Sequence, residues 1–249
     1  MYAAVVLFLG LTWWAGSDRF GIGFSIPEMV ENASRAGRIL RDFANPAWGI
    51  VRHTVAPFLE TLQMAILGAV GGCLVALVVA FLASRVTTPN TATYLADKGV
   101  LNVLRAIPDL LYAMVFVATI SIGPLAGILA LFFFNIGVVA KLLSETVDGI
   151  DPGPVEAGHA SGATKLQTVR AAVFPQVLPN YLAYSLYTFE LNLRASTVLG
   201  LVGAGGIGVF IQTQLAAFRY DRLAVVIFEI FLIVFVVESI SIALRRRLV

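Results

Sequence analysis

The chain has 249 residues, of which 59% are hydrophobic and 13% carry a charged side chain. A mean hydropathy of +0.88, together with about half the charge of an ordinary soluble domain, excludes a soluble globular fold. The net charge is only +2, and the one basic run, Arg245–Arg247, is typical of an anchor at a membrane edge, so nucleic-acid binding has no support.

Long apolar runs predict helices that cross a membrane. Residues 61–84 and 110–140 contain no charged side chain. In hydrocarbon a helix satisfies its own backbone groups, so an uncharged run of about 18 residues or more is a candidate span. We expect an all-α polytopic membrane protein with about six transmembrane helices. They are predicted at 1–17, 54–84, 99–120, 124–143, 178–199 and 223–244.

The N-terminal part differs in character from the rest. Residues 1–17 lack a basic start and a good cleavage site, so we interpret them as a retained helix rather than a signal peptide. The polar stretch 18–53 predicts short helices along the extracytoplasmic membrane surface. We therefore divide the chain into residues 1–53 and a transmembrane domain, 54–249, in which Ser121–Pro124 forms a tight turn between two helices.

Charge alone decides the topology only weakly. An even number of spans places both termini on one side, and that side then holds eight lysines and arginines against seven on the other. We expect both termini in the cytoplasm, mainly because of the long polar loop 144–177.

Residue patterns for catalysis are missing. Lys98, Lys141 and Lys165 do not end a phosphate-binding glycine-rich loop, and the two histidines are far apart without metal-ligand spacing. We expect no catalytic residue, no metal site and no cofactor in this chain. If ATP drives its function, another chain hydrolyses the ATP.

A glycine cluster follows the fifth predicted span. Residues 203–208 fit the pattern of a dinucleotide-binding loop, but they follow a membrane helix rather than a strand. We expect the glycines to pack backbones closely or to break a helix near the outer face, where a gate could form. They are Gly203, Gly205, Gly206 and Gly208.

Charged side chains at membrane depth are costly, so each is a functional candidate. Three pairs of opposite charge are four residues apart, a spacing that places both members on one helix face. The pairs are Arg105 with Asp109, Lys141 with Glu145, and Glu190 with Arg194.

Two interpretations of these charges stay open. Each pair is either an internal ion pair or, for Arg105 and Arg194, part of an oxyanion path, since arginine binds phosphate-like oxygens through two hydrogen bonds. On the last span, Glu229 needs a partner from another helix, and Glu238 is expected near Arg245.

The loop 144–177 has the pattern of two short helices around a glycine. A helix is expected at Val155–Ala160, a turn at Ser161–Gly162, and a second helix at Lys165–Val173 that ends before Pro175. This arrangement is either a projecting knob that docks into a groove on a soluble partner or a solvated connector.

The loop resembles the EAA loop of permease subunits from binding-protein-dependent ABC importers. Glu156-Ala157-Gly158 corresponds to the Glu-Ala-Ala triplet, Gly162 has the right spacing, and Ala172-Val173-Phe174-Pro175 closes the pattern. Gly158, Ala172 and Phe174 depart from the usual residues. Phosphonate-type permeases are still more similar over about residues 55–249, through the motifs at 123–127, 141–145, 152–156, 174–179 and 202–208.

The resemblance implies the MetI-like fold of type I ABC importer permeases and a place in the bacterial inner membrane. It implies a second permease copy as a homodimer, two ATPase subunits that bind ATP and Mg, and an extracytoplasmic binding protein. It makes 144–177 cytoplasmic and Glu156–Lys165 the coupling helix, with Glu156 as the charged anchor and Gly162 at the turn. The implied ATPase-coupling residues are Glu156, Ala157, Gly158, His159, Gly162, Ala163 and Lys165.

The favoured function is thus ATP-driven import of phosphonate, or of phosphate or phosphite, by alternating access. The alternative is an ion-coupled secondary carrier that acts without an ATPase and uses its buried charges as a relay. A membrane enzyme lacks a nucleophile, base or metal pattern. Nothing in the sequence separates one oxyanion from another.

Overall fold

The computed structural model describes residues 2–17, 25–88 and 90–247, and these are helical without a strand. The chain forms two compact units, Met1–Pro46 and Ala47–Val249. The second unit begins at Ala47, whereas the sequence placed the boundary after residue 53.

The described part of the N-terminal unit holds three helices. Helix α1 (Tyr2–Gly16) is apolar along its whole length, as predicted for 1–17. Helices α2 (Ile26–Glu31) and α3 (Ala33–Ala44) are the short helices expected within 18–53, and α3 is amphipathic. Residues 18–24 lie outside the described part of the chain.

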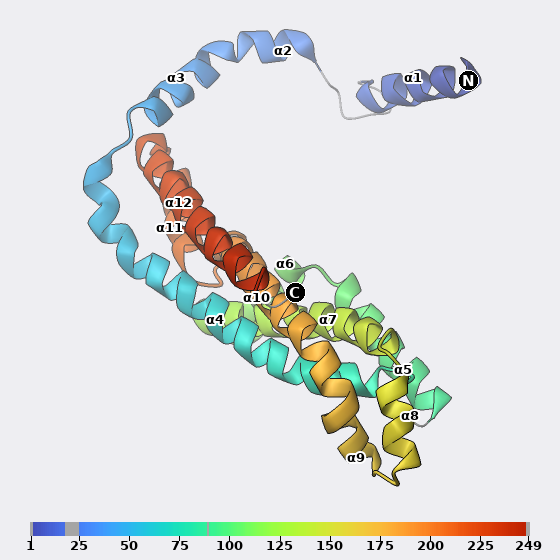
Figure 1. The fold of residues 1–249 in the computed structure, drawn as a ribbon. Helices are drawn as coiled ribbons and strands as arrows, with labels where there is room; N and C mark the ends of the chain where they lie inside the picture. Colours follow the sequence, from blue (N-terminus) through green and yellow to red (C-terminus); the bar gives the residue numbers. More distant parts are fainter. Residues whose placement is uncertain (1, 18–24, 89, 248–249) are drawn as a thin grey trace. The chain divides into compact units, whose positions relative to one another are not determined.

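The core of the second unit is formed by α4 (Val51–Leu82), α7 (Pro124–Asp148) and α10 (Phe174–Gly200), which pack against one another (Figure 1). Gly68 and Gly72 let α4 approach α7 closely: a Cβ atom on Gly72 would lie 2.6 Å from the Cβ of Asn135. Lipid gives helices no hydrophobic drive to associate, so such close backbone contact stabilises the pair by van der Waals packing.

Proline breaks the third predicted span. We predicted one helix at 99–120, but α5 (Thr91–Ala106) and α6 (Asp109–Thr119) meet at an angle of 83°. Pro108 has no N–H to donate and disfavours helical geometry at Ile107, whose ψ is 120°. The predicted turn before Pro124 is confirmed, since Pro124 starts α7 directly after Gly123 at φ +144°.

Two further helices of this unit follow α10 in the chain. Helix α12 (Tyr220–Arg245) contains the predicted span 223–244. Helix α11 (Ile207–Ala216) was not predicted, because ten residues are too few to span a bilayer and its N-cap residue, Gly206, offers no capping side chain.

Within the described residues, Trp48–Leu82, Pro124–Asp148 and Tyr220–Arg245 are each long and apolar enough to cross a membrane. The bent pair α5–α6 makes a fourth candidate if it is one broken span, while α1 and α11 are shorter apolar helices. Helix α10 covers the predicted span 178–199 but begins four residues earlier, at Phe174. The all-α polytopic fold is as expected.

Candidate coupling loop and membrane-embedded site

The loop between α7 and α10 is a compact helical hairpin. Helix α8 (Gly153–Ala160) is followed by a turn, by α9 (Lys165–Thr168) and by a π-helical turn, Val169–Val173, that runs directly into α10. The expected stop before Pro175 is therefore wrong. Pro175 lies in the first turn of α10, where its missing N–H costs little.

Local hydrogen bonds fix the tip of this hairpin. Gly162 has φ +77°, a left-handed conformation that ends α8, and the Ala163 N–H donates to the Gly158 carbonyl over 3.0 Å. The Thr164 side chain then caps α9 in a reciprocal capping box with Gln167. The turn is thus a fixed structure that holds α8 and α9 against each other (Figure 1).

The hairpin presents its polar side chains outward. Glu156, Ala157, His159 and Lys165 are exposed, and Leu166 is 78% exposed beside them. The tip of the hairpin thus offers a mainly polar surface with one large aliphatic side chain, Leu166.

Gly158, which departs from the EAA pattern, has a packing role. A Cβ atom on it would lie 3.2 Å from the hydroxyl of Thr168, so the glycine lets α8 lie against the end of α9. The two halves of the hairpin are therefore closely packed.

A polar network joins the membrane helices just before the hairpin. The Asp148 carboxylate accepts hydrogen bonds from the Ser84 hydroxyl, 2.7 Å, and the Arg85 N–H, 2.8 Å. Lys98 lies 3.5 Å from the same carboxylate and donates to the Ser144 hydroxyl over 2.9 Å. The turn that follows α4 and helix α5 thus meet α7 at Asp148. Sequence reasoning missed this network, because the side chains that bond to each other are 46 to 64 residues apart in the chain.

The glycine cluster forms the loop that separates helix α10 from helix α11. Gly203, Gly205 and Gly206 all have positive φ, and a Cβ atom on Gly205 would lie 2.7 Å from the Cα of Pro124. The Gly123 N–H donates to the Gly203 carbonyl over 2.9 Å, so this loop packs against the α6–α7 turn. Gly208 packs against Gly200, which brings α11 onto α10.

Two side chains from α4 accept hydrogen bonds from backbone N–H groups at the start of α11. The Glu60 carboxylate accepts a hydrogen bond from the Gly206 N–H at 2.9 Å, and the Thr61 hydroxyl accepts one from the Ile207 N–H at 2.8 Å. Sequence reasoning missed Glu60, which directly precedes the uncharged run 61–84.

Two of the three predicted charge pairs are wrong, and the third is confirmed. Lys141 and Glu145 form an ion pair of 3.0 Å on α7. Glu190 is buried and pairs with Arg245 of α12 at 2.7 Å, rather than with Arg194, which is exposed. Arg245 is therefore engaged by Glu190 and not, as expected, by Glu238.

Arg105 and Asp109 do not share a helix face. The proline break places Arg105 in the last turn of α5 and Asp109 in the first turn of α6, where its carboxylate accepts from the Leu110 N–H over 2.8 Å. Asp109 thus satisfies a free N–H at the start of α6. Arg105 is exposed.

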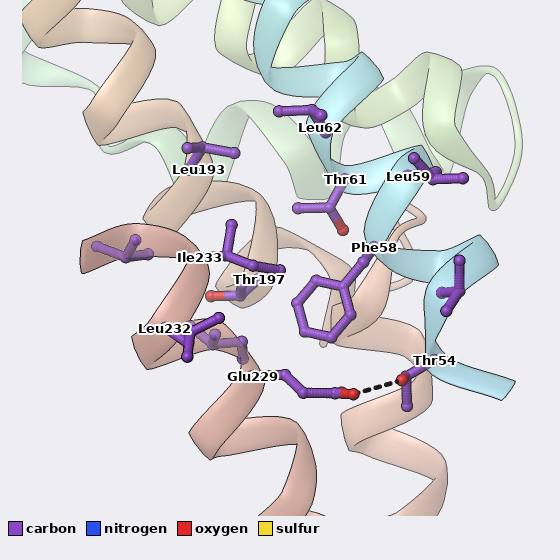
Figure 2. A pocket seen from close by; sticks show the side chains of 13 residues that line it. Thr54, Phe58, Leu59, Thr61, Leu62, Leu193, Thr197, Glu229, Leu232 and Ile233 are labelled. Atoms are coloured by element: carbon purple, nitrogen blue, oxygen red, sulfur yellow. Dashed lines mark hydrogen bonds between the residues drawn. The ribbon is translucent and has the colours of Figure 1, made fainter. Parts of the chain in front are cut away.

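Glu229 lies beside an apolar cavity of about 350 Å³ between α4, α10 and α12 (Figure 2). The predicted partner from another helix is Thr54 of α4, whose hydroxyl donates to the Glu229 carboxylate over 3.0 Å. The second carboxylate oxygen is buried without a hydrogen-bond partner in the described structure. No cationic side chain lines this cavity among the described residues.

The described residues hold no cluster of three or more histidine, cysteine or acidic side chains that could bind a metal ion. The arrangement is an intramembrane helix bundle with an external hairpin. Residues 76–249 match the family described as the inner membrane component of binding-protein-dependent transport systems. The chain belongs to this family.

Relatives of this permease are transport proteins. It is 33% identical to a phosphite transport system permease of Stutzerimonas stutzeri over 96% of this chain and 91% of that protein. It is 38% identical to a phosphate-import permease of Mycolicibacterium smegmatis over 82% of this chain, but only 38% of that longer protein. An inward-facing MetNI methionine ABC transporter structure is 25% identical, with a TM-score of 0.71, over 81% of this chain and 98% of that one.

Proposed function

We propose that this permease is the translocating subunit of an ATP-driven importer for phosphonate or a related oxyanion, phosphite or phosphate. The observation that carries the proposal is the exposed α8–α9 hairpin at the end of the core helices, in a chain of a binding-protein-dependent family. The names of the phosphite and phosphate relatives, and the phosphonate-type motifs, support the cargo class.

The partners follow from the family. Two copies of this chain, as a homodimer, would form the path, two ATPase subunits would bind ATP and Mg, and an extracytoplasmic binding protein would deliver the cargo. The hairpin then faces the cytoplasm, and both termini lie on that side of the bacterial inner membrane.

The geometry suggests how the ATPase would move the membrane helices. Glu156, Ala157, Gly158, His159, Gly162, Ala163 and Lys165 form or support the surface offered to the ATPase groove. Because the π-helical turn continues into α10 and α7 ends at Asp148, a displaced hairpin pulls on two core helices at once. Rigid helices transmit such motion to the far end of the bundle.

At that far end, the glycine loop joins α10 to α11 and touches the α6–α7 turn. Gly203, Gly205, Gly206 and Gly208 would act there as the hinge of an outer gate. Arg105 and Arg194, both exposed in this single chain, would supply the guanidinium groups that an oxyanion path requires. Asp109 and Glu190 would instead shape the path indirectly, through the start of α6 and the ion pair with Arg245.

The test is uptake by vesicles that contain the permease, its ATPase and its binding protein. Glu156→Arg is expected to abolish ATP-dependent uptake without loss of the folded permease, because it reverses the charge on the docking surface. Glu156→Gln, compared with Glu145→Gln on α7, separates the docking surface from general surface charge. Unchanged uptake by Glu156→Arg would contradict the assignment. Competition of uptake by phosphonate, phosphite and phosphate then identifies the cargo.

A further inference from the structure

A second apolar groove, distinct from the Glu229 cavity, runs between α4, α10 and the end of α12. Its volume is about 700 Å³. Ile66, Val70 and Leu74 of α4 form one wall, and they are 42%, 54% and 60% exposed. Leu182 of α10 lies opposite and is also exposed. Because this bundle lies in hydrocarbon, lipid chains fill an open apolar groove of this kind wherever no protein segment covers it.

The length of the wall fits a lipid chain. Ile66 and Leu74 are eight residues apart on one helix face, which corresponds to about 12 Å at 1.5 Å per residue. Half of a bilayer's hydrocarbon core is about 15 Å thick. A single acyl chain that lies along α4 would therefore cover the stripe.

A single charged group belongs to this groove. Arg247 is the one ionisable side chain among its described lining residues apart from the Tyr181 phenol and the Cys73 thiol, and no acidic residue lines it. The neighbouring Arg245 is neutralised by Glu190, whereas no ion pair joins Arg247 within the described part of the chain. A positive group at the end of an apolar groove matches an anionic headgroup attached to an acyl chain.

Two of the other polar side chains of the groove, those of Ser185 and Cys73, are already engaged. The Ser185 hydroxyl donates to the Tyr181 carbonyl at 2.8 Å, and the Cys73 sulfur lies 3.5 Å from the Thr188 hydroxyl. A small, strongly hydrated oxyanion needs polar groups on several sides to replace its water, and the described lining of this groove is apolar apart from Arg247, the Tyr181 phenol and the two engaged side chains. Its chemistry therefore favours an amphiphile over the cargo.

From these observations we infer that the groove is a binding site for an anionic phospholipid, with an acyl chain along Ile66, Val70 and Leu74 and the phosphate against Arg247. The site does not depend on which cargo the permease carries. The bound lipid would fill the space between α10 and α12 beside the Glu190–Arg245 ion pair.

The test uses the purified complex of permease and ATPase in nanodiscs of phosphatidylcholine with a fraction of phosphatidylglycerol. Native mass spectrometry after mild delipidation counts the phosphatidylglycerol that stays bound. Arg247→Gln is expected to lower this occupancy about fivefold, the effect of one basic residue at a membrane surface. Val70→Phe, which fills the groove from an exposed position, is expected to lower it with Arg247 intact.

Two matched controls lie just outside the groove. Arg246→Gln removes the same charge from a neighbouring residue. Val75→Phe makes the same valine-to-phenylalanine change at another exposed position of α4, so both variants should retain the lipid. If Arg246→Gln and Arg247→Gln lose the same amount of bound phosphatidylglycerol, general surface charge explains the binding and the proposed site is wrong. Equal retention of phosphatidylcholine, or displacement of the lipid by phosphate or phosphonate, would also overturn it. Because lipid is counted directly, failure of transport leaves this test unaffected.

Discussion

The Arg245 guanidinium, near the end of α12, lies 2.7 Å from the Glu190 carboxylate in the second half of α10. Both side chains are largely shielded, with 27% of the arginine and 7% of the glutamate exposed. The pair joins two helices that pack against each other. It also makes Arg245 a structural residue, in contrast to Arg247.

Glu190→Gln is expected to destabilise the permease by about 3 kcal/mol, because Arg245 would be left partly buried without its counter-charge. The measurement is the free energy of unfolding in detergent by denaturant titration. Arg194→Gln, an exposed charge one helical turn along α10, should change it by less than about 0.5 kcal/mol.

The double variant Glu190→Leu with Arg245→Met tests the cause. Once both charges are removed, no desolvated charge remains, so stability should return close to that of the unchanged protein. If the double variant is as unstable as Glu190→Gln, the loss comes from packing and the ion pair is not its source.

The hydrophobic runs were enough to predict the α-helical bundle, because an apolar stretch such as 61–84 has one stable form in lipid. The hairpin was also predictable, since Pro154 marks its start and Gly162 its turn. The stop at Pro175 was nevertheless wrong, because proline is tolerated in the first turn of a helix.

Partners between helices were not predictable from spacing. Glu190 and Arg194 have the right separation for a pair on one helix, but the bundle brings Arg245 closer to Glu190. Glu60 likewise reaches a backbone N–H 146 residues away. Such choices depend on tertiary packing, which a single sequence does not display.

Gly205→Ala is expected to destabilise the permease by about 2 kcal/mol or more. The added methyl group would lie 2.7 Å from the Cα of Pro124, and φ at this position is +89°. Thermal unfolding of the purified protein measures the effect. Gly99→Ala is the control, because Gly99 lies within α5 with open space around it, and alanine there should stabilise the helix by up to about 1 kcal/mol. A stable Gly205→Ala variant would show that the glycine loop adopts another conformation.

Asp148→Ala is expected to cost about 2 kcal/mol, because the buried Ser84 hydroxyl loses its acceptor and Lys98 loses its counter-charge. Glu145→Gln removes the ion pair with Lys141. Because the Glu145 side chain is 55% exposed, this change should cost less than about 1 kcal/mol of stability. Denaturant titration compares the two. In vesicles, Asp148→Ala should also lower the cargo moved per ATP hydrolysed, since this network holds α4 and α5 to the helix that leads into the hairpin. If both variants lose the same free energy of unfolding, the Asp148 network contributes no more to stability than an exposed ion pair.

Glu229→Gln is expected to leave ATP-driven uptake within about twofold of the unchanged permease. The amide keeps the shape of the side chain and accepts the same hydrogen bond from Thr54 (Figure 2). No cationic side chain lines the cavity among the described residues, so loss of the negative charge leaves no cation there without a counter-charge. Glu229→Lys should abolish uptake, because it places a cation in an apolar cavity. Initial uptake rates with and without a protonophore measure both. An ion-coupled carrier predicts the opposite pattern, since its relay would need the ionisable carboxyl: Glu229→Gln would stop uptake, and the protonophore would stop uptake by the unchanged protein even with ATP present.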